Sequence, residues 1–599
     1  MSKFGLVYLW VEKYKNIENE GFNFSPRFKC EYIKNQNMLT INEKKEYTSI
    51  FPENINITAI VGENGSGKSS ILELLFAKYN EEKIFFIFQN QENNEFLLLG
   101  TKKDIICISS NLNFKNIQLN TLECLPNTKA IYYSNILNKN DLYLQEFFVP
   151  HTYTHAVNIS TSHLLSQMKL IETNLHKGWN KSVTGFDKIY RSFEIQQIQN
   201  AIILIKDEAV QIPFELPEKL IIQNINFEFF LKNIEKKFDN TNYKKILKII
   251  RTNNDKKTIF KNYLSTNLIV ALLLENINSN NPILDELLNI ILDEKMMNYL
   301  SDFYHEVKNR LYGYRFILND EFFYASDIDR FFDLADDILI ALDRFNFSER
   351  DKYSLVLDIK NTDFSFFKSY EKLIQQSEYF WDISWRGLSS GEETFLYQFS
   401  RFYNLKNSFK NDPYKNLIAG NDAIAKNLIL LIDEGEVTLH PEWQKKYMNY
   451  LVEFLKKNFS QNINLVLTTH SPFILSDIPK EQLIFLESGK QVHPFKKNEQ
   501  TFGANIHTLL SHGFFMKDTL ISEYAQNKIQ NVINILNEDK PNFAEKDFVK
   551  NIIEKIGEPF LRYKLQDMYD KVFLDEFERN QKIKYLEKEI EKLKNVKNN

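Results

Sequence analysis

The sequence predicts an α/β fold with a mixed central sheet that is interrupted by a large, mostly helical segment. An alternating strand pattern at 55–61 passes through a glycine-rich turn into helically spaced apolar residues at 71–76. Two continuous apolar runs, at 427–432 and 464–467, have the composition of buried parallel strands. Between 145 and 350 the apolar spacing is helical, with asparagine-rich connections.

Composition sets the limits of this interpretation. A chain of 599 residues is too long for one core, and 43% hydrophobic residues exclude a mostly disordered protein. The formal net charge of −5 gives no global attraction to nucleic acid or to an anionic membrane, so such binding would have to be local.

Three cysteines, Cys30, Cys107 and Cys124, lack the spacing of a thiolate zinc site or a disulfide framework, which fits a reducing compartment. The first ten residues do not have the pattern of a signal peptide, and the longest apolar run, 268–274, is far shorter than a membrane span. We therefore expect a cytoplasmic protein that does not enter the membrane.

The elements in chain order suggest four regions. Short strands are expected at 5–11, 22–33, 84–88, 96–99, 105–109 and 130–133, and they form an N-terminal α/β lobe with an antiparallel accessory sheet. We predict this lobe at 1–140, a mostly helical insertion at 141–350, a second lobe at 351–515 and a helical C-terminal region at 516–599.

The glycine-rich turn has the composition of a phosphate-binding loop. Its glycines allow the backbone to turn tightly and to direct N–H groups inward, and the positive end of the following helix favours an anion. Lys68 would reach the β- and γ-phosphates of a nucleotide, and the Ser69 hydroxyl would bind Mg²⁺. The predicted nucleotide-binding residues of this loop are Asn64, Gly65, Ser66, Gly67, Lys68, Ser69 and Ser70.

Three later segments can complete such a site. Ser389, Ser390 and Gly391 open a helix, where a hydroxyl and a bare backbone N–H suit an anion. The apolar run at 427–432 ends in Asp433 and Glu434, which could hold Mg²⁺ and accept a proton from an attacking water.

A further apolar run ends at His470. An imidazole at this strand end could donate a hydrogen bond to a γ-phosphate. A single histidine is more often structural than catalytic, but here it is the fourth element of an ordered series.

A basic stretch stands out inside the helical insertion. Between 232 and 257 there are nine lysines and arginines against three acidic residues. This stretch could contact the phosphate backbone of DNA, whereas a solvated helix face in a lysine-rich chain is the commoner explanation.

Taken together, these segments resemble the motifs of ABC-type ATPases. Gly-Glu-Asn-Gly-Ser-Gly-Lys-Ser at 62–69 resembles the Walker A motif, Leu-Ser-Ser-Gly-Glu at 388–392 the signature, Leu-Ile-Asp-Glu at 431–434 the Walker B motif and Thr-Thr-His-Ser-Pro at 468–472 the switch histidine. The signature, the Asp433–Gln444 segment and the switch ending resemble more narrowly the branch that contains RecF, SMC, Rad50 and the overcoming-lysogenisation-defect (OLD) ATPases. The resemblance covers 1–135 and 380–515 well and the middle poorly.

The resemblance implies an ABC-type P-loop ATPase head that uses ATP and Mg²⁺ and pairs head-to-tail as a homodimer or higher homo-oligomer. Each nucleotide would lie between Lys68 of one chain and Ser389, Ser390 and Gly391 of another. The family pattern makes Asp433 a magnesium residue, Glu434 the general base and His470 the γ-phosphate sensor, with a dimer-contact loop at 437–440. Ser390 replaces the first signature glycine, and Gln89 and Asn135 are both candidates for the Q-loop residue.

The segment at 502–510 and the helical residues after it resemble ATPases of anti-phage defence modules such as Septu, PARIS and some retrons. In that branch the ATPase serves a separate effector, often a nuclease. Our first hypothesis is therefore a slow ATPase that acts as a switch and scaffold for such an effector. The alternative is a DNA-binding repair or maintenance factor of the RecF or Rad50 kind, using 232–257.

A self-contained nuclease is disfavoured, because no convincing carboxylate set follows the switch histidine. The last helix pattern, with Ile583, Leu586, Ile590 and Leu593 at 3-4-3 spacing, fits a docking helix and a frayed terminal helix equally well.

Overall fold

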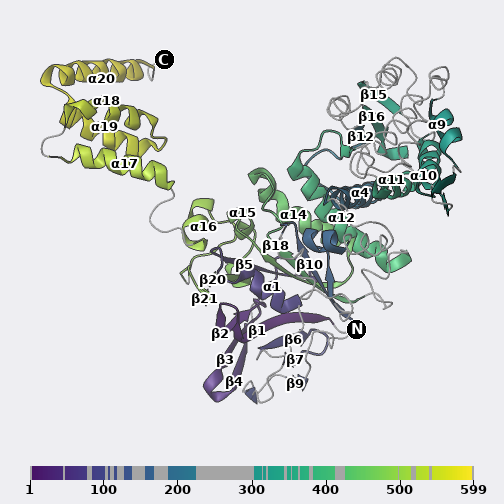
Figure 1. Ribbon diagram of the computed structural model, residues 1–599. Helices are drawn as coiled ribbons and strands as arrows, with labels where there is room; N and C mark the ends of the chain where they lie inside the picture. Colours follow the sequence, from purple (N-terminus) through teal and green to yellow (C-terminus); the bar gives the residue numbers. More distant parts are fainter. Residues whose placement is uncertain are drawn as a thin grey trace. The chain divides into compact units, whose positions relative to one another are not determined.

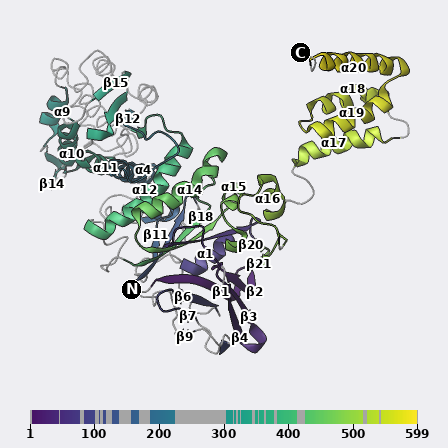
Figure 2. The same ribbon diagram turned by 180° about the vertical axis from the view of Figure 1, so that it is seen from behind.

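A computed structural model of the protein describes residues 3–44, 47–76, 84–100, 106–107, 113–117, 127–137, 156–167, 186–223, 303–312, 315–318, 321–324, 326–342, 347–351, 354–361, 364–376, 382–411, 425–496, 498–514, 521–538 and 542–596. The chain forms two compact units, Met1–Leu509 and Leu510–Asn599 (Figures 1 and 2). The boundaries at 140, 350 and 515 stay predictions.

A seven-stranded, largely parallel sheet forms the centre of the first unit. Its strand order is β11-β10-β18-β19-β5-β20-β21, and each pair of neighbours is parallel except β20 and β21. The strands are β5 (Ile55–Gly62), β10 (Thr128–Ser134), β11 (Ala156–Asn158), β18 (Asn427–Asp433), β19 (Asn462–Thr468), β20 (Leu483–Glu487) and β21 (Lys490–Val492). The two apolar runs predicted as buried strands are confirmed as β18 and β19, in which every residue is buried.

The neighbours of β5 come from the far end of the chain. Ile57 pairs with Leu465 of β19 on one side, and Gly62 pairs with Leu486 of β20 on the other. Because the carboxyl ends of parallel strands meet at one edge, the residues that follow β5, β10, β18 and β19 gather there.

Two accessory sheets lie in the N-terminal lobe, and each combines antiparallel pairing with one parallel pair. One has the order β2-β1-β6-β7-β9 and the other the order β3-β4-β8. Their strands are β1 (Phe4–Tyr14), β2 (Ile17–Asn23), β3 (Phe28–Ile33), β4 (Met38–Glu43), β6 (Ile84–Asn90), β7 (Glu95–Gly100), β8 (Ile106–Cys107) and β9 (Asn113–Ile117). The single strand expected at 22–33 is wrong, since the chain turns at Pro26 and Arg27, where proline cannot donate a ladder hydrogen bond.

Buried asparagine amides join β1 to the central sheet. The backbone N–H of Phe4 donates to Oδ1 of Asn427, and that of Leu6 donates to Oδ1 of Asn464, both at 3.0 Å. Helix α1 (Lys68–Phe76) packs its apolar side chains into the same core as β1 and β5, including Leu72 and Leu75.

The described part of the predicted insertion and the residues after it combine helices with short strands. The helices are α4 (Phe186–Lys206), α9 (Phe303–Leu311), α10 (Ser326–Leu342) and α11 (Phe364–Gln376). The strands form a sheet of order β15-β16-β12-β17 and a hairpin, and they are β12 (Lys219–Gln223), β13 (Arg315–Leu318), β14 (Glu321–Tyr324), β15 (Phe347–Asp351), β16 (Ser354–Asp358) and β17 (Asp382–Trp385). Helix α10 lies within the segment 145–350, for which the apolar spacing predicts helices, whereas the basic stretch 232–257 lies outside the described residues.

The remaining helices of the first unit follow the predicted signature and Walker B segments. They are α12 (Ser390–Asn411), α14 (Pro441–Asn458), α15 (Pro472–Ser476) and α16 (Ile506–Gly513), the last of which spans the boundary between the units. Helix α4 packs against both α11 and α12.

The second unit is helical, as the sequence predicts. Its main helices are α17 (Glu523–Leu536), α18 (Lys546–Lys555), α19 (Pro559–Phe573) and α20 (Glu576–Val596). Residues from the first three, including Val549, Ile553 and Leu565, form a core of their own. In the part of the chain that the structure describes, no helix is long and apolar enough to cross a membrane.

Candidate active site

The glycine-rich turn connects β5 with α1, which is the strand–loop–helix setting that the sequence predicts. Gly65 and Gly67 have φ angles of 75° and 108°, a region that side chains other than glycine rarely adopt. Two neighbouring turns fix the loop from outside. Nδ2 of Asn16 donates to the carbonyl of Gly65 at 2.8 Å, and the N–H of Gly489 donates to the carbonyl of Ser66 at 3.0 Å.

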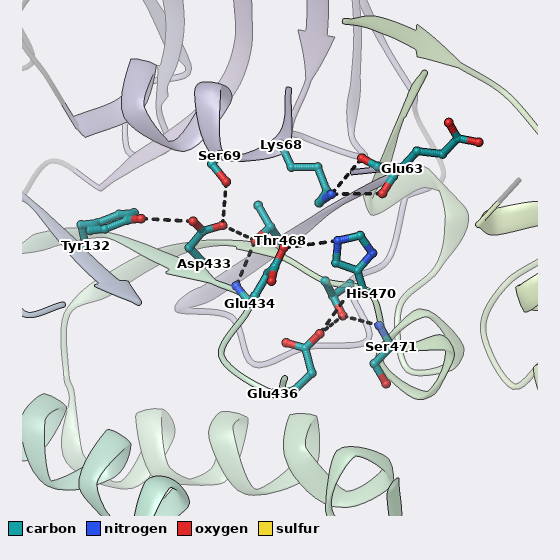
Figure 3. Close-up of polar contacts among 12 residues, drawn as sticks. Glu63, Lys68, Ser69, Tyr132, Asp433, Glu434, Glu436, Thr468, His470 and Ser471 are labelled. Carbon is teal, nitrogen blue, oxygen red and sulfur yellow. Dashed lines mark hydrogen bonds and ion pairs between the residues drawn. The ribbon is translucent and has the colours of Figure 1, made fainter. Parts of the chain in front are cut away.

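Lys68 is buried at the start of α1. Its ammonium donates to the carbonyl oxygens of Gly62 and Glu63, each at 3.1 Å (Figure 3). Burial lowers the pKa of Lys68, because a cation without a full charge partner is costly in the interior. The hydroxyl of Ser66 is buried nearby without a hydrogen-bond partner among the described residues. A buried cation and an unpaired hydroxyl fit an anionic ligand in this loop.

The other residues predicted for the loop differ in exposure. Asn64 and Ser69 are exposed, whereas Ser70 is buried. Among the described residues, Ser69 is the member of this loop that has a hydrogen bond to a second predicted motif, at Asp433.

Asp433 lies at the end of β18, where three hydroxyl groups surround it. Ser69 and Thr468 donate to its Oδ1 at 3.2 and 2.6 Å, and Tyr132 of β10 donates to Oδ2 at 3.1 Å. Figure 3 shows these side chains converging on the carboxylate. Burial raises the pKa of Asp433, although its hydroxyl partners act in the opposite direction. A carboxylate and a hydroxyl at this spacing suit Mg²⁺, which prefers oxygen ligands.

Glu434 follows Asp433 with an unusual backbone. Its φ angle is 48°, in the left-handed region, and its N–H donates to Oγ1 of Thr468 at 3.0 Å. Oε1 of Glu434 lies 3.2 Å from Nε2 of His470. The contact with His470 lowers the pKa of the Glu434 carboxyl below its ordinary value.

Glu436 fixes the segment that carries His470. Its carboxylate is 2% exposed and accepts hydrogen bonds from the Thr469 hydroxyl and, at 3.2 Å, from the backbone N–H of His470. Burial raises the pKa of Glu436. The carboxylates of Glu434 and Glu436 therefore both join the loop after β18 to the loop after β19.

The signature residues form a helix cap apart from this cluster. Ser389 and Glu392 exchange hydrogen bonds, with the Ser389 N–H donating to Oε2 of Glu392 at 2.7 Å, which is a capping box. Ser389 and Ser390 are exposed at the start of α12. Among the described residues, no hydrogen bond or ion pair joins Ser389, Ser390 or Gly391 to the cluster around Asp433.

The two candidate Q-loop residues lie in different sheets. Gln89 is buried in β6 of an accessory sheet and donates to Asn94. Asn135 follows β10, whose last residue, Ser134, pairs with Asp433, and it accepts a hydrogen bond from the Thr161 hydroxyl at 3.1 Å. Asn135 is therefore at the edge where the predicted catalytic residues gather.

Four residues at the site have no individual role in the sequence prediction, although Thr468 and Glu436 lie inside predicted motif segments: Asn16, Tyr132, Glu436 and Thr468. Tyr132 and Thr468 belong to strands that the sequence predicts. The hydrogen-bond partners of these two residues depend on the order of the strands in the sheet, and the sequence does not predict that order. For Asn16, the available signal was an asparagine in a turn between two strands. Many surface turns share this feature, so it does not indicate a site.

No protein-family model matches the chain. Among curated proteins, the chain is similar to the retron Vc95 probable ATPase of Vibrio cholerae serotype O1 biovar El Tor, with 32% identity over 106 residues, 17% of this chain and 18% of that protein. The retron Ec83 probable ATPase of Escherichia coli is 27% identical over 159 residues, 26% of this chain and 27% of that protein.

The Septu protein PtuA of Bacillus mycoides (strain KBAB4) is 29% identical over 132 residues, 22% of this chain and 18% of that protein. Each match spans less than a third of the relative's length. Over these partial stretches, the chain is distantly similar to probable ATPases of retrons and to a Septu protein.

Proposed function

We propose that this protein is an ABC-type ATPase that binds and hydrolyses ATP and whose nucleotide-dependent head pairing acts as a switch for an effector. The observation that carries the proposal is the convergence of Ser69, Asp433 and the Glu434–His470 pair at one sheet edge beside the buried Lys68. Three separate chain segments supply these groups. The names of the retron relatives, which are probable ATPases, agree with this chemistry.

Each residue has a role that follows from its surroundings. Lys68 and the loop N–H groups bind the phosphates, and Ser69 with Asp433 would hold Mg²⁺, which neutralises phosphate charge when bound. Glu434 is a carboxylate directly after the proposed magnesium residue and 3.2 Å from His470, which places it to take a proton from the attacking water. His470 is the proposed sensor of the γ-phosphate. Its Nε2 contacts Glu434 and is therefore already at the site of the proposed catalytic step.

The exposure of the signature supports a site shared between two chains. Ser389 and Ser390 are exposed, and the nearby Val437, in the expected dimer-contact loop, is 48% exposed. A single chain thus leaves polar groups and an apolar side chain uncovered at the segments through which the resemblance predicts head-to-tail pairing. A γ-phosphate held by both chains favours the closed pair only while ATP is intact.

The relatives support a defence role for the switch. Two carry retron names and one a Septu name, and these are the systems that the sequence resembles. We propose that a separate effector, for example a nuclease, is controlled by the ATP-held pair. The DNA-binding alternative rests on 232–257, outside the described residues, and stays a prediction.

The test compares wild type with Glu434→Gln. The amide keeps the shape but cannot accept the proton, so we expect hydrolysis to fall at least 100-fold while an ATP-held assembly accumulates. Light scattering after size exclusion, with and without ATP and Mg²⁺, measures the assembly. Glu453→Gln, a surface change on α14, is the control.

Monomers for both wild type and Glu434→Gln at saturating ATP would contradict head pairing. An absence of phosphate release by the wild-type protein, measured with any effector that co-purifies, would contradict the ATPase activity itself.

A further inference from the structure

A buried polar pair lies beside the residue that follows the proposed general base. Glu434 adopts a left-handed conformation at φ 48°, which a glutamate rarely adopts unless its surroundings enforce it. The next residue, Gly435, is buried. A Cβ at this glycine would lie 2.7 Å from Oη of Tyr447 and 2.8 Å from Nε2 of Gln398. A side chain at this position would therefore force these neighbours to shift.

The two side chains behind Gly435 form a buried hydrogen bond. Nε2 of Gln398 donates to the Tyr447 hydroxyl at 2.6 Å, and the two residues are 0% and 1% exposed. Oε1 of Gln398 has no hydrogen-bond partner among the described residues. A buried polar atom without a partner costs stability, and an apolar side chain of similar volume would avoid that cost. Core packing alone therefore does not account for this glutamine.

The pair connects two helices that belong to different motifs. Tyr447 lies on α14, which follows the Walker B turn, whereas Gln398 lies on α12, about two helical turns after the signature residue Ser390. A displacement of α12 along its axis would move the Gln398 amide relative to Gly435. The Gln398–Tyr447 hydrogen bond thus joins the helix that begins at the signature to the helix that follows the Walker B turn.

We propose that Gln398 and Tyr447 are positioning residues that hold Glu434 in its left-handed conformation and couple it to the signature helix α12. The proposal rests on the proposed function, in which the signature contacts the nucleotide of a partner. When the signature closes around the partner's nucleotide, α12 would then fix the position of Glu434, the general base in this chain's own site. Neither residue touches substrate, so the pair affects the catalytic step and leaves nucleotide binding unchanged.

The first experiment removes one hydroxyl. Tyr447→Phe keeps the ring and its packing but deletes the hydroxyl that accepts the hydrogen bond from Gln398 and lies beside Gly435. We expect kcat for ATP hydrolysis to fall about tenfold or more, with KM and the ATP dissociation constant within twofold of wild type. We also expect the ATP-held assembly to persist longer, as for Glu434→Gln. The matched control, Tyr450→Phe, removes a hydroxyl from the same helix and should hydrolyse ATP like wild type.

A double variant separates positioning from packing. Gln398→Leu combined with Tyr447→Phe replaces both polar partners with apolar groups, which should restore thermal stability towards the wild-type value. Hydrolysis should stay low, because nothing then holds Gly435 in the same way. Recovery of both stability and kcat in the double variant would show that the pair only fills the core and would overturn the proposal.

The outcomes distinguish this proposal from the proposed function. A wild-type protein that hydrolyses ATP, together with a Tyr447→Phe variant of equal kcat, overturns the positioning role alone. A wild-type protein that binds ATP without hydrolysing it overturns both. If Tyr447→Phe folds poorly, the kcat of the double variant decides between the two outcomes.

Discussion

The hydroxyl of Ser69 donates to Oδ1 of Asp433 at 3.2 Å, although the two residues are separated by 364 positions in the sequence. This hydrogen bond joins the first residues of α1 to the end of β18. It places the two oxygen groups expected to hold Mg²⁺ on one side of the loop that contains Lys68.

Asp433→Asn tests the magnesium role directly. The amide oxygen can still accept the hydroxyl groups of Ser69 and Thr468, but the negative charge that would attract Mg²⁺ is lost. We expect ATP hydrolysis to fall about 100-fold or more. Titration of Mg²⁺ at fixed ATP, followed by phosphate release, measures the effect. Asp477→Asn, which neutralises a carboxyl after α15, should leave hydrolysis unchanged, and an equal loss in both variants would argue against a specific role.

Tyr132→Phe tests the unpredicted hydroxyl on Asp433. Loss of a hydrogen bond that favours the ionised carboxylate raises the pKa of Asp433 further above its ordinary value. We expect a roughly tenfold lower kcat/KM, with a larger loss at low pH than at high pH. Tyr133→Phe, on the opposite face of β10, is the control. A flat ratio of variant to wild-type activity across pH would contradict this explanation.

Glu393→Gln tests whether an unfavourable charge next to the signature lowers the stability of the protein. Burial, together with the neighbouring charge of Glu194, raises the pKa of Glu393 to about 6. Because the folded state binds the proton more tightly than the unfolded state, stability is lost as pH rises from about 4.5 to 6. We expect Glu393→Gln to stabilise the protein at pH 7.5 by roughly 1–2 kcal/mol, and by much less at pH 4.5. Melting temperatures at both pH values measure this, and an equal gain at both would refute it.

Ile553→Ala tests whether the C-terminal unit has its own core. The side chain is fully buried on α18, and truncation in a packed core costs about 2–5 kcal/mol. We expect the unfolding transition of Leu510–Asn599 to shift to lower denaturant, while ATP binding by Met1–Leu509 stays the same. Ile583→Ala, at a position that is 52% exposed, should shift nothing. Loss of ATP binding in Ile553→Ala would show that the units do not fold separately.

The sequence was sufficient for features that depend on local pattern. The strand–loop–helix at 55–76, the buried strands before Asp433 and His470, and the helical C-terminal region all follow from apolar periodicity. It was not sufficient for contacts that depend on strand order. Tyr132 reaches Asp433 only because β10 lies beside β18, and Glu436 reaches Thr469 only because the loops after β18 and β19 meet. The prediction of a single strand at 22–33 was also wrong. It relied on the apolar content of this segment and did not use Pro26 as a strand-breaking signal.

The position of β5 between β19 and β20 has a consequence for the synthesis of the protein on the ribosome. Both backbone edges of this strand pair with residues 463–468 and 483–486, so they have no partner strand while most of the chain is still untranslated. The amide groups of Asn427 and Asn464 that anchor β1 also arrive late. A nascent chain therefore carries the phosphate loop early but acquires a nucleotide-binding head only near the end of translation.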